Sequence, residues 1–158
     1  MSSKEDNEKE VLKVEIKELK EKLISMQQPL REKGLPVIVL VEGWAAAGKG
    51  SLINELISEI DPRFYNVTSP VIASESEERY PFLYPYATAI PENGKIMFYD
   101  SGWMEDVVRK YLHREITKEQ YKERVRSVNE FERQLRDGGY IILKLFLHID
   151  KKEQRGRL

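Results

Sequence analysis

The segment from Leu35 to Ile60 constrains the fold of this chain more than any other. Leu35 to Glu42 (LPVIVLVE) is continuously apolar and rich in β-branched residues, which indicates a strand buried on both faces. It leads into the glycine-rich stretch GWAAAGKGS, after which apolar residues recur at helical spacing up to Ile60. A strand, a glycine loop and a helix in this order predict a loop that binds phosphate groups.

The loop itself fits the pattern G-x-x-x-x-G-K, from Gly43 through Gly48 to Lys49. Its glycines let the backbone curve into a concavity of N–H donors, and the helix that follows points its positive end at the same place. Lys49 would reach the terminal phosphates as a point charge. The alternative is a glycine-rich turn whose lysine only faces water. We expect phosphate binding by the following residues: Gly43, Gly48, Lys49, Gly50 and Ser51.

One position of the motif is unusual, because residue 50 is normally a Ser or Thr whose hydroxyl binds magnesium. Here it is Gly50, and the nearest hydroxyl, that of Ser51, lies about 100° further round the helix. Ser51 is therefore no simple substitute.

A second apolar stretch, Lys95 to Asp100 (KIMFYD), ends in a carboxylate. In a phosphate-loop protein the strand at this point carries the acidic residue that holds the metal. We therefore favour Asp100 as a magnesium ligand and, with Lys49, as a candidate catalytic residue. The alternative is an Asp that only ends the strand or caps the next helix.

The N-terminal part, residues 1–33, is expected to be a charged tail and an amphipathic helix that Pro29 and Gly34 bring to an end. Its apolar residues follow a heptad spacing, namely Leu12, Ile16, Leu19, Leu23, Met26 and Leu30. The stripe is too short for a free-standing coiled coil, so we expect the helix to pack on its own domain or on another subunit. A homo-oligomer is the natural expectation.

Residues 34–158 are expected to form one domain. A short helix is predicted over Trp103–Glu115, and a longer one opens at Thr117, with Gln120 as its capping-box partner. The latter stops at Gly138 and Gly139, before an apolar strand over Tyr140–Ile149. Strands that alternate with helices predict an α/β fold with a mainly parallel sheet, here a P-loop NTPase-like three-layer fold.

The segment from Pro62 to Pro91 is harder to predict, although a short strand near Tyr65–Thr68 and a later helix are plausible. Its aromatic residues could stack on a nucleobase, but filling the core or an interface is the more common role.

Composition excludes several classes of function. The net charge of −1 lacks the basic field of most nucleic-acid binders, and the absence of cysteine excludes disulfides, thiolate metal sites and cysteine nucleophiles. The two histidines, His113 and His148, have no metal-ligand spacing. The charged N-terminus does not resemble a signal peptide, and no apolar run is long enough to span a membrane, so we expect a cytoplasmic protein.

Taken together, these motifs resemble polyphosphate kinase family 2, and most closely the N-terminal half of its tandem-domain members, the polyphosphate:AMP phosphotransferases. The family loop resembles E-G-x-D-A-A-G-K-G, so the glycine at position 50 is a family feature. Other matching segments occur in family order: Asp61-Pro62-Arg63, Pro91 to Ile96, Phe131-Glu132, Lys144 to Asp150 and Glu153 to Arg155.

The resemblance implies phosphoryl transfer between polyphosphate and a nucleoside phosphate, with Mg²⁺ as cofactor. It also reveals departures: Ala45 replaces the loop aspartate, and Ser101 to Asp106 (SGWMED) replaces R-S-W-Y-N-R, so both arginines are lost. If Glu105 or Asp106 faces the site, it adds like-charge repulsion toward phosphate. The family's lid is expected beyond Leu158, so the domain would lack its lid and C-terminal part.

Three interpretations remain open at this point. The chain is an active polyphosphate-dependent kinase, a catalytically degraded phosphate-binding or scaffold half that works with a second catalytic domain, or an unrelated P-loop nucleotide kinase or NTPase. Intact loop glycines together with lost catalytic side chains favour the second.

Overall fold

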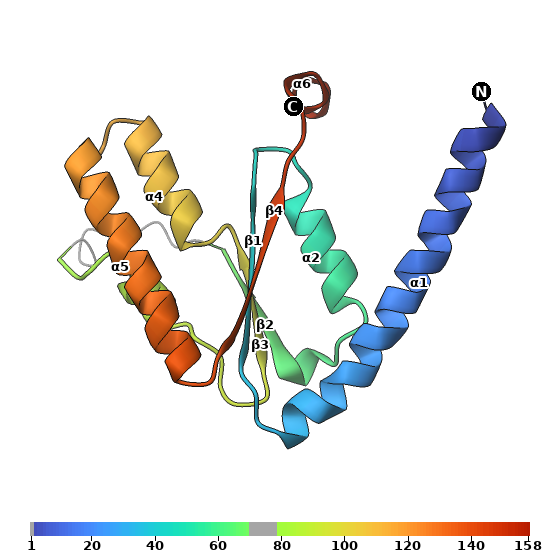
Figure 1. Cartoon of the computed structure of the whole chain (residues 1–158), viewed down its shortest axis with the longest axis horizontal. Coiled ribbons are helices and arrows are strands. Elements are labelled where there is room, and N and C mark those ends of the chain that lie inside the picture. Colours follow the sequence, from blue (N-terminus) through green and yellow to red (C-terminus); the bar gives the residue numbers. More distant parts are fainter. Residues whose placement is uncertain (1, 70–78) are drawn as a thin grey trace.

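The computed structural model describes residues 2–69 and 79–158, and the side chains from residue 6 onward. Figure 1 shows a central sheet seen nearly edge-on with helices on both sides. The elements follow in chain order: α1 (Ser2–Glu32), β1 (Val37–Gly43), α2 (Lys49–Ile57), the 3-10 turn Pro62–Phe64, β2 (Tyr65–Thr68), α3 (Tyr84–Ala87), β3 (Ile96–Asp100), α4 (Trp103–Leu112), α5 (Lys118–Asp137), β4 (Ile141–Leu147) and α6 (Lys151–Arg157).

The four strands form one parallel sheet in the order β2-β3-β1-β4. β1 lies between β3 and β4, and its residues from Val37 to Val41 are all buried. This position explains the unbroken apolar run, because a strand covered on both faces needs apolar side chains in both directions. The predicted strand near Tyr65–Thr68 is β2, at one edge of the sheet.

Two apolar cores lie on opposite faces of the sheet, so the three-layer α/β fold is confirmed. One core gathers side chains of α4 and α5, with Trp103 and Val107 fully buried between them and the sheet. The other core takes Ile53 from α2 and side chains from the end of α1. In Figure 1 these two groups of helices stand on the two sides of the strands.

Helix α1 is longer than the sequence predicts. It begins at Ser2, so the charged N-terminal residues are helical, and it runs through Pro29 to Glu32. The prediction that Pro29 ends it is wrong, because a proline in the last turn removes only one helical hydrogen bond. Gly34, with φ of 60°, follows the last turn, and Leu35 N donates to Leu30 O there.

Only the second half of α1 packs on the domain. Leu23 and Leu30 contact the core on the α2 side, whereas Leu12, Ile16 and Leu19 are about half exposed or more. The first half extends away from the remaining helices (Figure 1). Of the heptad stripe, Leu23 and Leu30 therefore pack on the domain, and the remaining members are exposed: Leu12, Ile16, Leu19 and Met26.

The predicted start of the long helix is confirmed by α5. Thr117 Oγ1 accepts a hydrogen bond from Gln120 N, and the Gln120 side chain accepts one from Thr117 N, which completes a capping box. The helix ends before Gly138 and Gly139, as predicted. On its buried face, Glu132 accepts a hydrogen bond of 2.8 Å from the indole N–H of Trp103.

The aromatic residues of the segment Pro62–Pro91 that the structure describes serve packing first. Tyr86 is buried in the core against Tyr99 and Trp103, and Tyr65 contacts Phe98 edge to face. Tyr80 and Tyr84 stack on each other at the surface. Residues 70–78 of this segment lie outside the described part of the chain.

Candidate phosphate-binding site

The loop between β1 and α2 has the backbone conformation that its sequence predicts. Gly43, Ala46 and Gly48 have positive φ angles of 151°, 60° and 97°. Gly48 is the N-cap of α2, and no side chain caps the helix there. The backbone N–H groups of the first turn therefore face the loop. Backbone N–H groups in such a loop, together with the positive end of α2, are suited to hold an anion.

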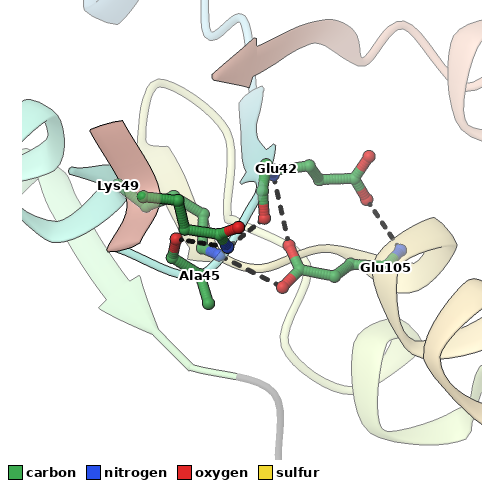
Figure 2. Close-up of polar contacts among 6 residues, drawn as sticks. Glu42, Ala45, Lys49 and Glu105 are labelled. Atoms are coloured by element: carbon green, nitrogen blue, oxygen red, sulfur yellow. Dashed lines mark hydrogen bonds and ion pairs between the residues drawn. The ribbon is translucent and has the colours of Figure 1, made fainter. Parts of the chain in front are cut away.

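Lys49, the first residue of α2, turns back over the loop. Its ammonium group donates to Gly43 O at 2.9 Å and to Glu105 Oε1 at 3.2 Å (Figure 2). The side chain is only 15% exposed, against 31% for Glu105, so the ion pair is partly shielded from water. The prediction that Lys49 lies at the loop is therefore matched by its position, and the lysine already has an anionic partner.

That partner comes from the first turn of α4. Besides pairing with Lys49, the carboxylate of Glu105 accepts a hydrogen bond of 3.4 Å from Gly43 N. Of the two acidic residues in this turn, only Glu105 faces the loop. Asp106 instead pairs with Arg109 and Lys110 within α4.

A second carboxylate, Glu42 at the end of β1, holds the start of α4. Its Oε1 accepts a hydrogen bond of 3.3 Å from Glu105 N (Figure 2), which supplies the N-terminal cap that the preceding Gly102 cannot. Burial raises the pKa of Glu42, and the nearby charge of Glu105 adds to this effect. A side chain at Gly102 would place its Cβ 2.6 Å from Glu42 Oε1.

Asp100, the predicted magnesium ligand, ends β3 beside the loop. It is paired with Val41 in the sheet register, two residues before Gly43. A Cβ added to Gly50 would lie 3.9 Å from Asp100 Oδ2, so this carboxylate faces the first turn of α2. Ser51 lies further round the helix and is exposed. The role of Asp100 as a metal ligand stays a prediction.

The acidic side chains of the described residues do not form a ready-made metal cage. No group of three or more His, Cys, Asp and Glu suited to a metal ion occurs among the residues that the structure describes. Mg²⁺, however, is commonly held by one or two carboxylates together with substrate phosphates and water. Asp100 beside the phosphate loop fits that kind of site.

The C-terminal helix α6 covers the loop from the other side. Gln154 Nε2 donates to Ala45 O at 3.0 Å, and Arg157 Nη1 donates to Ala46 O at 3.4 Å. The same guanidinium lies 3.8 Å from where a Cβ on Gly48 would be. Arg157 thus places a second cationic side chain at the loop, and its Nε pairs with Glu153 at 2.7 Å.

The protein-family model for polyphosphate kinase 2 (PPK2) matches residues 3–158. The chain belongs to this family. A solved polyphosphate kinase 2 from Arthrobacter aurescens TC1 has the same fold, with a TM-score of 0.85 at 24% identity over 90% of this chain and 52% of that one.

Two curated relatives extend the comparison. The AMP/ADP-polyphosphate phosphotransferase of Meiothermus ruber is 31% identical over 89% of this chain and 53% of its own length. The polyphosphate:AMP phosphotransferase of Pseudomonas syringae pv. tomato is 29% identical over 80% of this chain and 26% of its own length. The chain therefore spans between about a quarter and a half of these PPK2 relatives. An unrelated P-loop NTPase, one of the interpretations left open above, is excluded.

Several of these contacts could not be predicted from the sequence. The sequence raises Glu105 only as a conditional like charge, and its pairing with Lys49 joins residues 56 positions apart. Gln154 and Arg157 reach loop carbonyls about 110 positions away. No spacing rule links such positions, because the contacts depend on how α4 and α6 meet the end of β1.

Proposed function

We propose that this chain is the phosphate-binding half of a PPK2-type polyphosphate:nucleoside-phosphate phosphotransferase and that it transfers phosphoryl groups weakly or not at all by itself. Its ligands would be polyphosphate and a nucleoside phosphate, and catalysis would need a second domain or another subunit. A cytoplasmic location is part of this proposal, since nucleoside phosphates are metabolites of that compartment.

One observation carries the proposal: the loop has a backbone conformation suited to an anion, yet its lysine is paired with the Glu105 carboxylate. The backbone turn and the α2 N-terminus favour an anion at this place. Phosphoryl transfer also needs cations and an oriented acceptor around the moving group. Ala45, where the family motif has Asp, cannot bind a metal or orient an acceptor.

Magnesium would be held by Asp100 with the phosphates of the ligand. The metal neutralises charge on the phosphates when it is bound. This chain contributes the Asp100 carboxylate, the Lys49 ammonium and the loop N–H groups, and Arg157 adds a cation at the loop surface.

The competing interpretation is an active kinase. It draws support from Lys49 and Asp100 at the loop, and it predicts nucleotide formation from polyphosphate by the purified chain. Our proposal predicts binding with weak turnover or none.

Thermal unfolding with polyphosphate, ATP, ADP and AMP, each with and without Mg²⁺, tests both interpretations. A ligand that binds only the folded state at about 100 times its Kd stabilises by about 2.7 kcal/mol. We expect polyphosphate to raise the Tm of the wild type, and Lys49→Ala to abolish the shift. A folded wild type that no ligand stabilises would refute phosphate binding. In a separate activity assay, polyphosphate-dependent formation of ADP or ATP at about 1 s⁻¹ or faster, the range of ordinary enzymes, would refute catalytic degradation.

A further inference from the structure

Glu105 occupies the position at the phosphate loop where an anionic ligand is expected to bind. Its two carboxylate oxygens are each used: one pairs with Lys49 Nζ and the other accepts from Gly43 N. Both donors belong to the loop, and both are of the kind that holds phosphate in a P-loop. The carboxylate is therefore a built-in anion at the loop.

The backbone at Glu105 is anchored by neighbouring structure, which places its side chain beside the loop. Glu42 holds the backbone N–H of Glu105 through a hydrogen bond of 3.3 Å. The close approach of Glu42 is possible because Gly102 has no Cβ, which would otherwise lie 2.6 Å from Glu42 Oε1. The first turn of α4 is thereby anchored to the end of β1, with Glu105 directed at Lys49 (Figure 2).

We propose that Glu105 competes with phosphate for Lys49 and so lowers the affinity of this loop for polyphosphate. A phosphate that takes Lys49 displaces the carboxylate, which is 31% exposed and has solvent to turn into. The displaced charge stays near the bound polyanion and repels it. This inference deepens the proposed function and rests on it, since it concerns the regulation of the same loop.

Two substitutions at position 105 distinguish the effect of the carboxylate charge on phosphate affinity from the effect of the side chain's size. Glu105→Gln keeps the size of the side chain and removes the charge, and Glu105→Ala removes the group entirely. Two unit charges about 4 Å apart interact by about 1 kcal/mol even in water, which corresponds to about a fivefold change in Kd. We expect both variants to bind tripolyphosphate at least about fivefold more tightly than the wild type.

Asp106→Asn is the matched control, because it removes the same charge from the next residue, whose partners are Arg109 and Lys110. Isothermal titration with tripolyphosphate, at fixed salt and with Mg²⁺ constant, compares the four proteins after thermal unfolding has established that each is folded. We expect the Kd of Asp106→Asn to stay within about twofold of the wild type, since the Asp106 carboxylate pairs with Arg109 and Lys110 within α4 and not with the loop.

The outcomes separate this inference from the proposed function. Tighter binding by both Glu105 variants, but not by Asp106→Asn, supports competition at Lys49. Equal gains in all three variants mean a general charge effect, and equal or weaker binding by the Glu105 variants means that the carboxylate does not compete. Either result overturns the inference while phosphate binding stands. No binding by any folded variant overturns both.

Discussion

Gly43, the last residue of β1, has no room for a side chain. An added Cβ would lie 2.3 Å from the backbone oxygen of Leu147 on β4, and the φ angle of 151° disfavours other residues. We expect Gly43→Ala to lower the free energy of unfolding by at least about 2 kcal/mol, the combined scale of backbone strain and overpacking. Urea denaturation measures this.

Gly50→Ala is the control for that substitution. Its Cβ would make only an ordinary contact, 3.9 Å from Asp100 Oδ2, and alanine is the better helix former. Stability equal to the wild type or up to about 1 kcal/mol higher is expected. Similar losses in the two variants would show that the β1–β4 approach is not what requires Gly43.

Glu42 makes stability depend on pH. Burial raises its pKa above the ordinary value of 4.5, so the folded protein binds this proton more tightly than the unfolded chain does. The contribution of Glu42 is therefore most favourable below pH 4.5, and it is lost as the pH rises through the pKa of the folded state. Glu42→Gln keeps an acceptor for Glu105 N and removes the charge.

We expect Glu42→Gln to be more stable than the wild type at pH 7, with the difference shrinking as the pH falls through the raised pKa of the folded state toward 4.5 and staying constant below that. Urea denaturation of both proteins from pH 4 to pH 8 gives this difference directly, and other titrating groups cancel because the two chains share them. A difference that does not vary with pH would show that Glu42 titrates normally in the folded state.

At the scale of elements, the second half of α1 packs on the domain and the first half is more exposed. Leu23 packs against the core on the α2 side, whereas Leu12, on the same heptad stripe, is 55% exposed. The second half also makes polar contacts with the domain: Gln27 Nε2 donates to Glu59 O, and Gln27 Oε1 accepts from Asp61 N. The stripe alone does not distinguish the two halves.

Leu23→Ala and Leu12→Ala make this division measurable. We expect Leu23→Ala to cost about 1–2 kcal/mol, less than the full cost of a completely buried leucine. Leu12→Ala should change stability by less than about 0.5 kcal/mol, because an exposed side chain has few contacts to lose. Chemical denaturation at low protein concentration gives both values, and a large, concentration-dependent loss for Leu12→Ala would point to a partner on the first half of the helix.

At the scale of the whole molecule, β4 leaves apolar surface uncovered. It is an edge strand of the described sheet, and Leu143 and Phe146 are 50% and 60% exposed. Side chains at 141, 143 and 145 share one face of the strand, and they are all at least 37% exposed. An apolar edge strand is a surface on which chains associate.

Leu143→Lys should weaken that association. We expect the wild-type chain to elute above the monomer mass in size-exclusion chromatography with light scattering, and Leu143→Lys to shift toward the monomer. Leu112→Lys is the control, since Leu112 is 68% exposed on α4, away from the sheet. A monomeric wild type at every concentration tested would contradict the prediction.

The length and hydropathy of the helices bear on membrane insertion. Among the described residues, no helix is both long and apolar enough to cross a bilayer.

The sequence by itself determined the elements and the identity of the loop. The buried run of β1, the glycines before Lys49 and the Thr117 capping box are local signals, because each depends on residues a few positions apart. The order of these motifs also carried the family resemblance, which the match over residues 3–158 confirms. The candidate roles of Lys49 and Asp100 follow from the same local patterns and stay predictions.

Only the tertiary structure shows which residues each element contacts. The sequence could not say that Glu105, and not Asp106, faces Lys49, nor that Arg157 reaches the loop. The apolar spacing of α1 and the composition of β4 likewise do not reveal which residues stay uncovered. The physical reason is the same in each case. Burial and ion pairing depend on distances in space between residues far apart in the chain, whereas sequence periodicity reflects only the arrangement of side chains within one helix or strand.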